Sequence, residues 1–282
     1  MTGTDVGEAA VERSGAVVPW TVVLLVGGSV ALVATVGQWG VAAGVGLWLR
    51  PTGFAVVAAG ILAGRPARWG SAVGLLVAGT LLGAFSSSVA WALAAFAAAA
   101  VSARLWARDD EGREGGSRSW LVRYVVVAVG GVVVFAATSA WLLDALGRAA
   151  FSVTAARTVS TNLPVALAGA PVVRLGLERA GEHDWRVHGR PLTASTRAAV
   201  ILIALLWTVG GELGSFLFRV VQRVPPASLA RRFPPAVVEF VTLWGWQGTY
   251  AQFSLGAVAL AAIGLLLRRR SPHRTDDDRT RS

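Results

Sequence analysis

Long apolar runs, separated by short polar or arginine-containing breaks, cover most of this chain. A helix that crosses a bilayer needs roughly 20 mostly apolar residues, and fewer where its ends are buried in protein. Eight segments meet this condition: 17–37, 39–64, 70–86, 88–104, 119–143, 149–175, 197–218 and 245–267. The sequence therefore predicts an all-α protein, a polytopic transmembrane helix bundle of about eight spans.

Arginines collect in alternate connections between these segments, and this sets the predicted orientation. Four stretches carry them: 65–68, 104–118, 174–190 and 268–270. Since short cytoplasmic loops are enriched in arginine and lysine, both termini are expected in the cytoplasm. The seventh connection, 219–244, is an exception, with four arginines on the expected outer side. Its paired prolines and apolar spacing indicate an amphipathic helix or hairpin on the membrane surface, and a miscounted segment is the alternative.

The same pattern divides the chain into five parts. They are a cytoplasmic tail at 1–16, a six-helix membrane core at 17–177, a charged cytoplasmic loop at 178–197, a two-helix membrane module at 198–267 with an outer amphipathic connection, and a cytoplasmic tail at 268–282. The last tail is charged and lacks apolar periodicity, so it is expected to be disordered.

Composition excludes several classes of function. The 282 residues are 54% hydrophobic and 15% charged, too apolar for a soluble domain, in which about 25% of residues are charged. The net charge of +10 comes from arginines at the ends of apolar runs, so we expect the lipid bilayer of the cell membrane as a partner and not nucleic acid. All 26 basic residues are arginine and there is no cysteine, which excludes a lysine Schiff base and thiol chemistry.

Glycines at a spacing of four recur in 40–44, 60–64, 70–74 and 79–83. Small residues at this spacing let helix backbones approach closely. We predict that these glycines pack helices within one chain and do not form a dimer face.

One predicted span carries a polar stripe. Arg157 lies about two turns into the segment 149–175, and Thr154, Thr158 and Thr161 share its helix face at spacings of three and four, with Asn162 slightly off that face. A charge near the middle of a membrane is costly, so the stripe is expected to face the bundle interior.

Glu212 is the one carboxylate well inside a predicted span, and the proposed topology gives it the depth of Arg157. Three interpretations stay open. The two residues form an ion pair, one or both bind a ligand, or the segment boundaries are wrong.

The stretch LWLRPTG, residues 47–53, combines a permanent cation with a helix breaker. The topology moves Arg50 to the outer end of a short helix, where Pro51 suits the first turn. Trp246 and Gln247 begin the last span at the same level, either as an interfacial belt or as the lining of a site for a small planar or anionic molecule.

The predicted ligand-binding residues are Arg50, Thr154, Arg157, Thr161, Asn162, Glu212, Trp246 and Gln247. No catalytic residue, metal ligand or cofactor is predicted. The two histidines of 182–188 are five residues apart, and a metal site normally needs three or four convergent ligands.

Two stretches resemble known families. Residues 48–84, with their tryptophan, proline and glycine pattern around a basic turn, resemble the membrane-associated sensor domain fused to histidine kinases and diguanylate cyclases. Residues 142–177 resemble the last helices of the substrate-binding S components of energy-coupling-factor transporters. The residues that would match the S-component pattern are Asn162, Pro164, Gly169, Pro171 and Arg174.

Either resemblance implies a small-molecule pocket open to the outside. An S component would hand its ligand to transporter subunits with an ATPase, and a sensor would act with a signalling partner. We therefore expect a multipass protein that binds or transports a small polar or anionic molecule. The alternatives are a sensory or scaffolding domain without transport, and a lipid-modifying membrane enzyme with Glu212 as acid or base, which the lack of a second nearby carboxylate or histidine disfavours.

Overall fold

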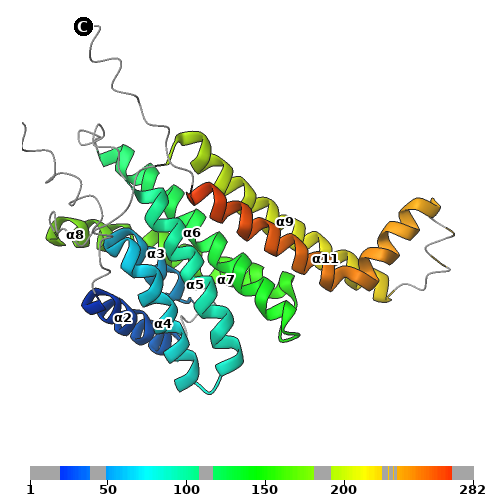
Figure 1. The fold of residues 1–282 in the computed structure, drawn as a ribbon, viewed down its shortest axis with the longest axis horizontal. Coiled ribbons are helices and arrows are strands. Elements are labelled where there is room, and N and C mark those ends of the chain that lie inside the picture. Colours follow the sequence, from blue (N-terminus) through cyan, green and yellow to red (C-terminus); the bar gives the residue numbers. More distant parts are fainter. Residues whose placement is uncertain are drawn as a thin grey trace, which may run out of the picture.

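The computed structural model describes residues 20–38, 49–107, 117–180, 192–223, 228, 231 and 234–268, without the side chains of 117–118, 180, 216–223, 237 and 239–251. The described residues form nine helices and no strand, which confirms the all-α class (Figure 1). The helices are α2 (Trp20–Gln38), α3 (Thr52–Ala63), α4 (Arg65–Leu81), α5 (Phe85–Trp106), α6 (Ser117–Ala145), α7 (Phe151–Ala168), α8 (Ala170–Ala180), α9 (Ala194–Arg223) and α11 (Pro235–Arg268).

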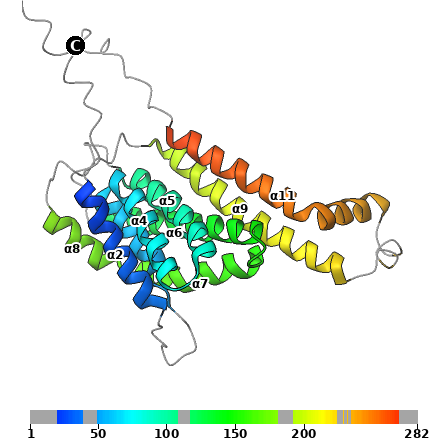
Figure 2. The ribbon, with the colours of Figure 1, turned by 60° about the horizontal axis from the view of Figure 1, so that its bottom comes forward.

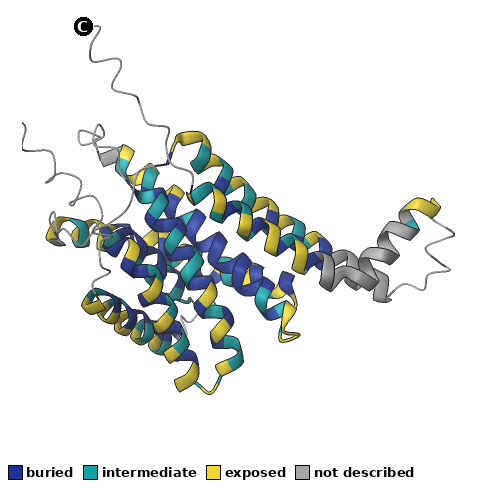
Figure 3. Cartoon of the chain, viewed as in Figure 1, coloured by how far each residue is buried: buried dark blue, intermediate teal, exposed yellow. Residues whose placement is uncertain are grey.

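The helices have the lengths and surfaces of a membrane protein. Four are long and apolar enough to cross a bilayer, over Trp20–Gly37, Phe85–Trp106, Ser119–Ala145 and Ala194–Ser215. Large apolar side chains such as Leu25, Val122 and Leu206 are exposed on the outside, and the buried residues gather in the centre of the bundle (Figure 3). Apolar surface of this extent is expected where a protein faces lipid. The count of eight spans and the sides of the termini stay predictions.

The short helix α3 lies at the centre of the bundle. It contacts α2, α4, α5, α6, α7 and α8, and its residues Val56, Val57 and Ile61 are fully buried. Its 12 residues span about 18 Å, less than the roughly 30 Å of a bilayer's hydrocarbon core. Within the described part of the segment predicted at 39–64, the helix covers only the 12 residues of α3. Pro51 precedes the helix, and Gly64 ends it with a φ of 66°.

The segment predicted at 149–175 is two helices. α7 ends at Ala168, and α8 runs in another direction on the far side of the bundle (Figure 2). Gly169 lies at the break, where a Cβ atom would meet the ring of Phe54 of α3 at 2.1 Å. The hydroxyl of Tyr124 on α6 donates to the carbonyl of Ala166, in the last turn of α7. This bond satisfies a carbonyl that the end of a helix leaves without a partner.

Replacing Tyr124 by phenylalanine should destabilise the protein by about 1 kcal/mol, because the buried carbonyl of Ala166 loses a hydrogen bond. The melting temperature of the purified protein would measure the loss. Thr80→Ala is the control, since the Thr80 hydroxyl is exposed and bonds only within its own helix, to the Leu76 carbonyl. Equal effects of the two substitutions would contradict the role of Tyr124.

Glycines allow the backbones of α2 and α4 to lie in direct contact. A Cβ atom on Gly70 would lie 2.7 Å from the carbonyl oxygen of Val23, and one on Gly74 would lie 2.4 Å from that of Gly27. Both distances are too short for a real Cβ atom, so only glycine fits at these two positions. The prediction that the glycines at 70–74 pack helices within the chain is confirmed, whereas the pair at 40–44 lies outside the described residues.

Helices α9 and α11 lie side by side and attach to the core through tryptophans. The indole of Trp141 on α6 donates to the carbonyl of Phe253 at 3.2 Å and meets the ring of Trp207 edge to face at 6.0 Å. Within the expected amphipathic connection, 219–244, residues 219–223 belong to α9 and residues 235–244 to α11, and most of 224–233 lies outside the described residues.

Arginines bind helix C-termini at one end of the bundle. The guanidinium of Arg104 on α5 donates to the carbonyl of Leu267 at the end of α11. Arg123, near the start of α6, donates to the carbonyls of Trp106 and Ala107 at the end of α5, the second at 2.6 Å. Cations at this position are favoured by the helix dipole. We call this end of the bundle the arginine-rich end.

Candidate functional site

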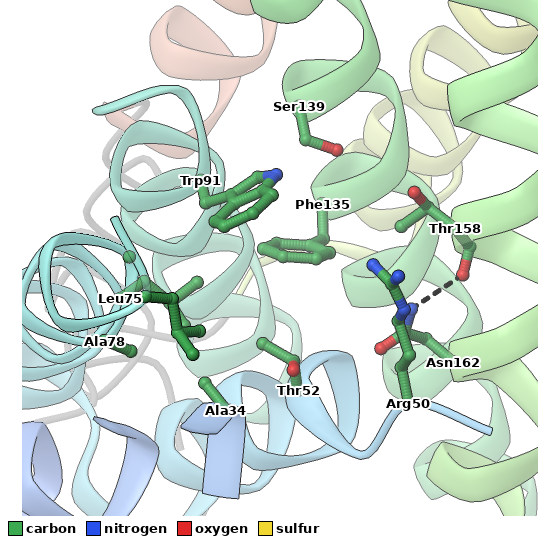
Figure 4. Close-up of a pocket in the computed structure, with 12 residues that line it drawn as sticks. Ala34, Arg50, Thr52, Leu75, Ala78, Trp91, Phe135, Ser139, Thr158 and Asn162 are labelled. Carbon is green, nitrogen blue, oxygen red and sulfur yellow. Dashed lines mark hydrogen bonds between the residues drawn. The ribbon is translucent and has the colours of Figure 1, made fainter. Parts of the chain in front are cut away.

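A cavity lies between the central helix α3 and its neighbours in the core (Figure 4). Its polar lining comes from the segment before α3, from the start of α3, and from α6 and α7. Its apolar lining comes from α2, α4 and α5, together with Phe135 of α6. The lining residues are Ala34, Arg50, Thr52, Leu75, Ala78, Gly79, Leu82, Trp91, Phe135, Ser139, Thr158 and Asn162.

Asn162 connects α7 to the first turn of α3. Its side chain is 2% exposed, and its Oδ1 atom accepts the backbone N–H of Gly53 at 2.7 Å. Its Nδ2 group donates to the carbonyl of Thr158 at 2.8 Å and to the hydroxyl of Thr161 at 3.2 Å. Every polar group of this buried amide therefore has a partner, and the amide holds the start of α3 in one position.

Arg50 lies deeper in the bundle than the sequence predicts. Its backbone N–H donates to the carbonyl of Thr161 at 3.1 Å. Thr161 is ten residues, or about 15 Å, from the first residue of α7. The sequence predicts Arg50 at the outer rim, whereas in the structure Arg50 lies beside the middle of α7. The reason is that α3 is a short central helix, so its first residue does not reach the end of the bundle.

The site is electropositive. The side chain of Arg50 points into the cavity toward Phe135 and Thr158 (Figure 4). The positive charge of Arg157 acts on that of Arg50, and a guanidinium remains charged at neutral pH. The lining contains no carboxylate, and Arg50 has no ion pair among the described residues. The first turn of α3 adds the positive end of its helix dipole.

The cavity is small. Its volume is about 40 Å³, and one water molecule needs about 10–15 Å³ of such space. The enclosed space therefore accepts about three waters or one compact ion. A larger molecule would require the surrounding helices to move.

The structure brings together some of the predicted site residues. Arg50 and Asn162 line the cavity, and Thr161 is buried against Asn162, its hydroxyl donating to the carbonyl of Arg157 at 2.7 Å. Thr154 is half-buried earlier on α7 and is not part of the lining. Arg157 is exposed and lies at the edge of the polar stripe. A long arginine side chain can reach outward from such a position. The stripe thus faces the interior at its C-terminal end only.

The other predicted residues do not reach the cavity. Glu212 is half-buried on α9, outside the lining. The helix α9 packs on the outside of the core against α6 and α7, which separate it from α3. The side chains of Trp246 and Gln247 and the histidine segment 182–188 lie outside the described residues.

Three polar lining residues were not among the predicted ligand-binding residues. Ser139 follows Thr138 inside a long apolar span, and this pair of adjacent hydroxyl residues could have indicated a cavity-facing position. Thr158 belongs to the predicted stripe, and Thr52 directly follows Pro51. The aromatic lining residues Trp91 and Phe135 carried no signal that distinguishes them from other apolar residues.

Comparison of the chain with family models, with characterised proteins and with solved structures gave no match. The resemblances to S components and to the sensor domain rest on the sequence patterns alone.

Proposed function

We propose that this protein is a multipass membrane protein that binds a small anion in the cavity around Arg50. The observation that supports the proposal is a half-buried guanidinium in a cavity whose described lining contains no carboxylate. A permanent charge away from water is costly unless an opposite charge or hydrogen bonds compensate it. An anion at this point would supply that opposite charge.

The lining offers an anion hydrogen-bond donors in addition to the charge of Arg50. The hydroxyls of Thr52 and Thr158 come from two helices, and the nearby charge of Arg157, outside the lining, adds to the positive potential at Arg50. Trp91 and Phe135 provide apolar lining beside these groups. A few converging polar groups in a mostly apolar cavity are typical of ligand sites. The volume of about 40 Å³ favours a compact monovalent anion of the size of chloride, nitrate or formate.

Transport is the second part of the proposal. Ligand sites of membrane carriers commonly lie where a helix is interrupted part-way across the bilayer, with a helix N-terminus directed at an anionic group. The short helix α3 has its N-terminus at the cavity. The resemblance to S components suggests passage to partner subunits, for which co-purification with an ATPase would be the supporting result.

The test is thermal stabilisation of the purified full chain by sodium chloride, nitrate or formate, with sodium gluconate at equal ionic strength as reference. An anion at 100 times its Kd stabilises its protein by about 2.7 kcal/mol, which raises the melting temperature by several degrees. Arg50→Gln should abolish this rise. Arg50→Lys, which retains the charge but loses the planar donor geometry, should retain part of it.

Arg148→Gln is the matched control, because Arg148 is exposed in the turn between α6 and α7. Its anion response should equal that of the unaltered protein. Arg157→Gln should give a smaller loss than Arg50→Gln, since Arg157 is outside the lining. A dose response of Arg50→Gln equal to that of the unaltered protein would refute the site.

A further inference from the structure

The cavity at Arg50 lies in the half of the bundle away from the arginine-rich end. Helix α6 starts at the arginine-rich end, and its lining residues Phe135 and Ser139 follow 18 and 22 residues later, or about 27 and 33 Å along the helix. Helix α5 ends at the arginine-rich end, and its lining residue Trp91 precedes that end by 15 residues, or about 22 Å. Both helices therefore place the cavity far from the arginines of that end.

Helix α4 shows in which direction the cavity opens. A short turn joins α4 to α5, and the ring of Trp69 near the start of α4 meets that of Phe96 on α5 at 4.9 Å, so α4 starts at the arginine-rich end. Its lining residues Leu75 and Ala78 are buried, whereas Leu82, directly after the last residue of the helix, is half-buried. The lining thus becomes more exposed toward the end of the bundle opposite the arginine-rich end.

The central helix α3 closes the other direction. It runs from the cavity toward the arginine-rich end, where α4 follows it. A Cβ atom on Gly60 of α3 would lie 2.8 Å from the carbonyl oxygen of Ala99 on α5, and one on Gly131 of α6 would lie 2.6 Å from the side chain of Val57 on α3. Helices α5 and α6 therefore touch α3 beyond the cavity, and this contact layer leaves no space for an anion.

We infer that the anion reaches Arg50 from the end of the bundle opposite the arginine-rich end, past Leu82 and Trp91, and that α3 separates it from the arginine-rich end. This inference rests on the proposed function. In carriers with a central site, access alternates between the two sides. Since arginine-rich loops are expected in the cytoplasm, the structure is the outward-open form, and release to the cytoplasm requires α3 to move relative to α5 and α6.

Cysteine labelling tests the route, because the chain has no cysteine of its own. Ser139→Cys places a thiol in the lining of the cavity, and Ser102→Cys places one in the contact layer, where the Ser102 side chain is likewise buried. A thiol packed away from water is inert. In the detergent-purified full chain, the small reagent methyl methanethiosulfonate should label Ser139→Cys about tenfold faster than Ser102→Cys. Equal labelling rates would overturn the inferred route.

The same variant separates the route from the anion site. Chloride or nitrate, compared with gluconate at equal ionic strength, should slow the labelling of Ser139→Cys severalfold, and adding Arg50→Gln should remove this protection. Fast labelling that neither anion slows would support the route and contradict the anion site, so the two proposals fail in different ways.

A second pair of variants tests the entrance at Leu82. N-benzylmaleimide coupled to Leu82→Cys before the anion is added should abolish the rise in melting temperature with chloride, because the benzyl group fills the entrance. Leu81→Cys is the matched control, since Leu81 is exposed on the same turn and is not among the lining residues. The same adduct there should leave the rise unchanged. Equal effects of the two adducts would also overturn the inference.

Discussion

Gly74→Leu should separate α2 from α4 and lower the free energy of unfolding by about 3 kcal/mol, at the upper end of the range for overpacked sites. A Cβ atom at this position would lie 2.4 Å from the carbonyl oxygen of Gly27 and 3.2 Å from the backbone nitrogen of Ala31. Both atoms belong to the backbone of α2, so no side-chain rotation can make room. The measurement is the melting temperature of the purified protein, followed through its 12 tryptophans.

Gly28→Leu is the matched control for this substitution. Gly28 lies on α2 next to Gly27, and a Cβ atom there would have no neighbour within 4 Å. Leucine has a higher helix propensity than glycine by roughly 0.5–1 kcal/mol, so this variant should melt at the same or a slightly higher temperature. If Gly74→Leu melts like Gly28→Leu, the close contact between α2 and α4 is absent in the protein.

Asn162→Leu should destabilise the protein by about 1–3 kcal/mol and also remove its response to anions. The substitution takes away the acceptor of the buried Gly53 N–H, at 2.7 Å, and leaves this group without a partner at the start of α3. The start of α3 lies two residues from the Arg50 backbone, so the position of the guanidinium should change as well. The two measurements are the melting temperature without ligand and its rise with added chloride or nitrate.

Ser160→Ala distinguishes this effect from a general loss of side-chain hydrogen bonds on α7. The Ser160 hydroxyl is exposed and donates only to the Arg157 carbonyl of its own helix, at 3.1 Å. Both the stability and the anion response of Ser160→Ala should be unchanged. If Asn162→Leu is destabilised but keeps the full anion response, the position of the start of α3 does not determine anion binding, and the prediction is wrong.

Much of the fold could be predicted because it depends on local properties of the chain. The apolar segments correspond closely to the observed helices, since a sequence that satisfies its backbone in an apolar environment has to form helices of this kind. The predicted segments and the observed helices differ where packing against other helices changes the length that a helix needs. α3 has only 12 residues because other helices surround it, and α7 ends at Gly169 because the ring of Phe54 occupies the space next to it.

The site was predicted only in part. The polar stripe of α7 is a local pattern, so Thr161 and Asn162 could be assigned to the interior from their spacing alone. The sequence predicts Glu212 as a partner of Arg157 in that stripe, because the proposed topology gives both residues the same depth. Depth along a membrane normal is a single coordinate, and it does not decide which helices are neighbours. In the structure α3 is the neighbour of α7 at this level, and Glu212 lies on α9 outside the cavity.

The sequence by itself determined the helical class, the membrane character, the main helix segments and the polar face of α7, because each depends on residues within a few turns of one another. The tertiary structure decided that the start of α3 meets α7, through hydrogen bonds from the Gly53 N–H to the Asn162 side chain, 109 positions away, and from the Arg50 N–H to the Thr161 carbonyl. It also decided that Arg50 lies in the middle of the bundle. The physical reason is that a fixed charge beside a helix breaker is tolerated either at a membrane surface or within a polar cavity, and only the packing of α3 between its neighbours selects the second.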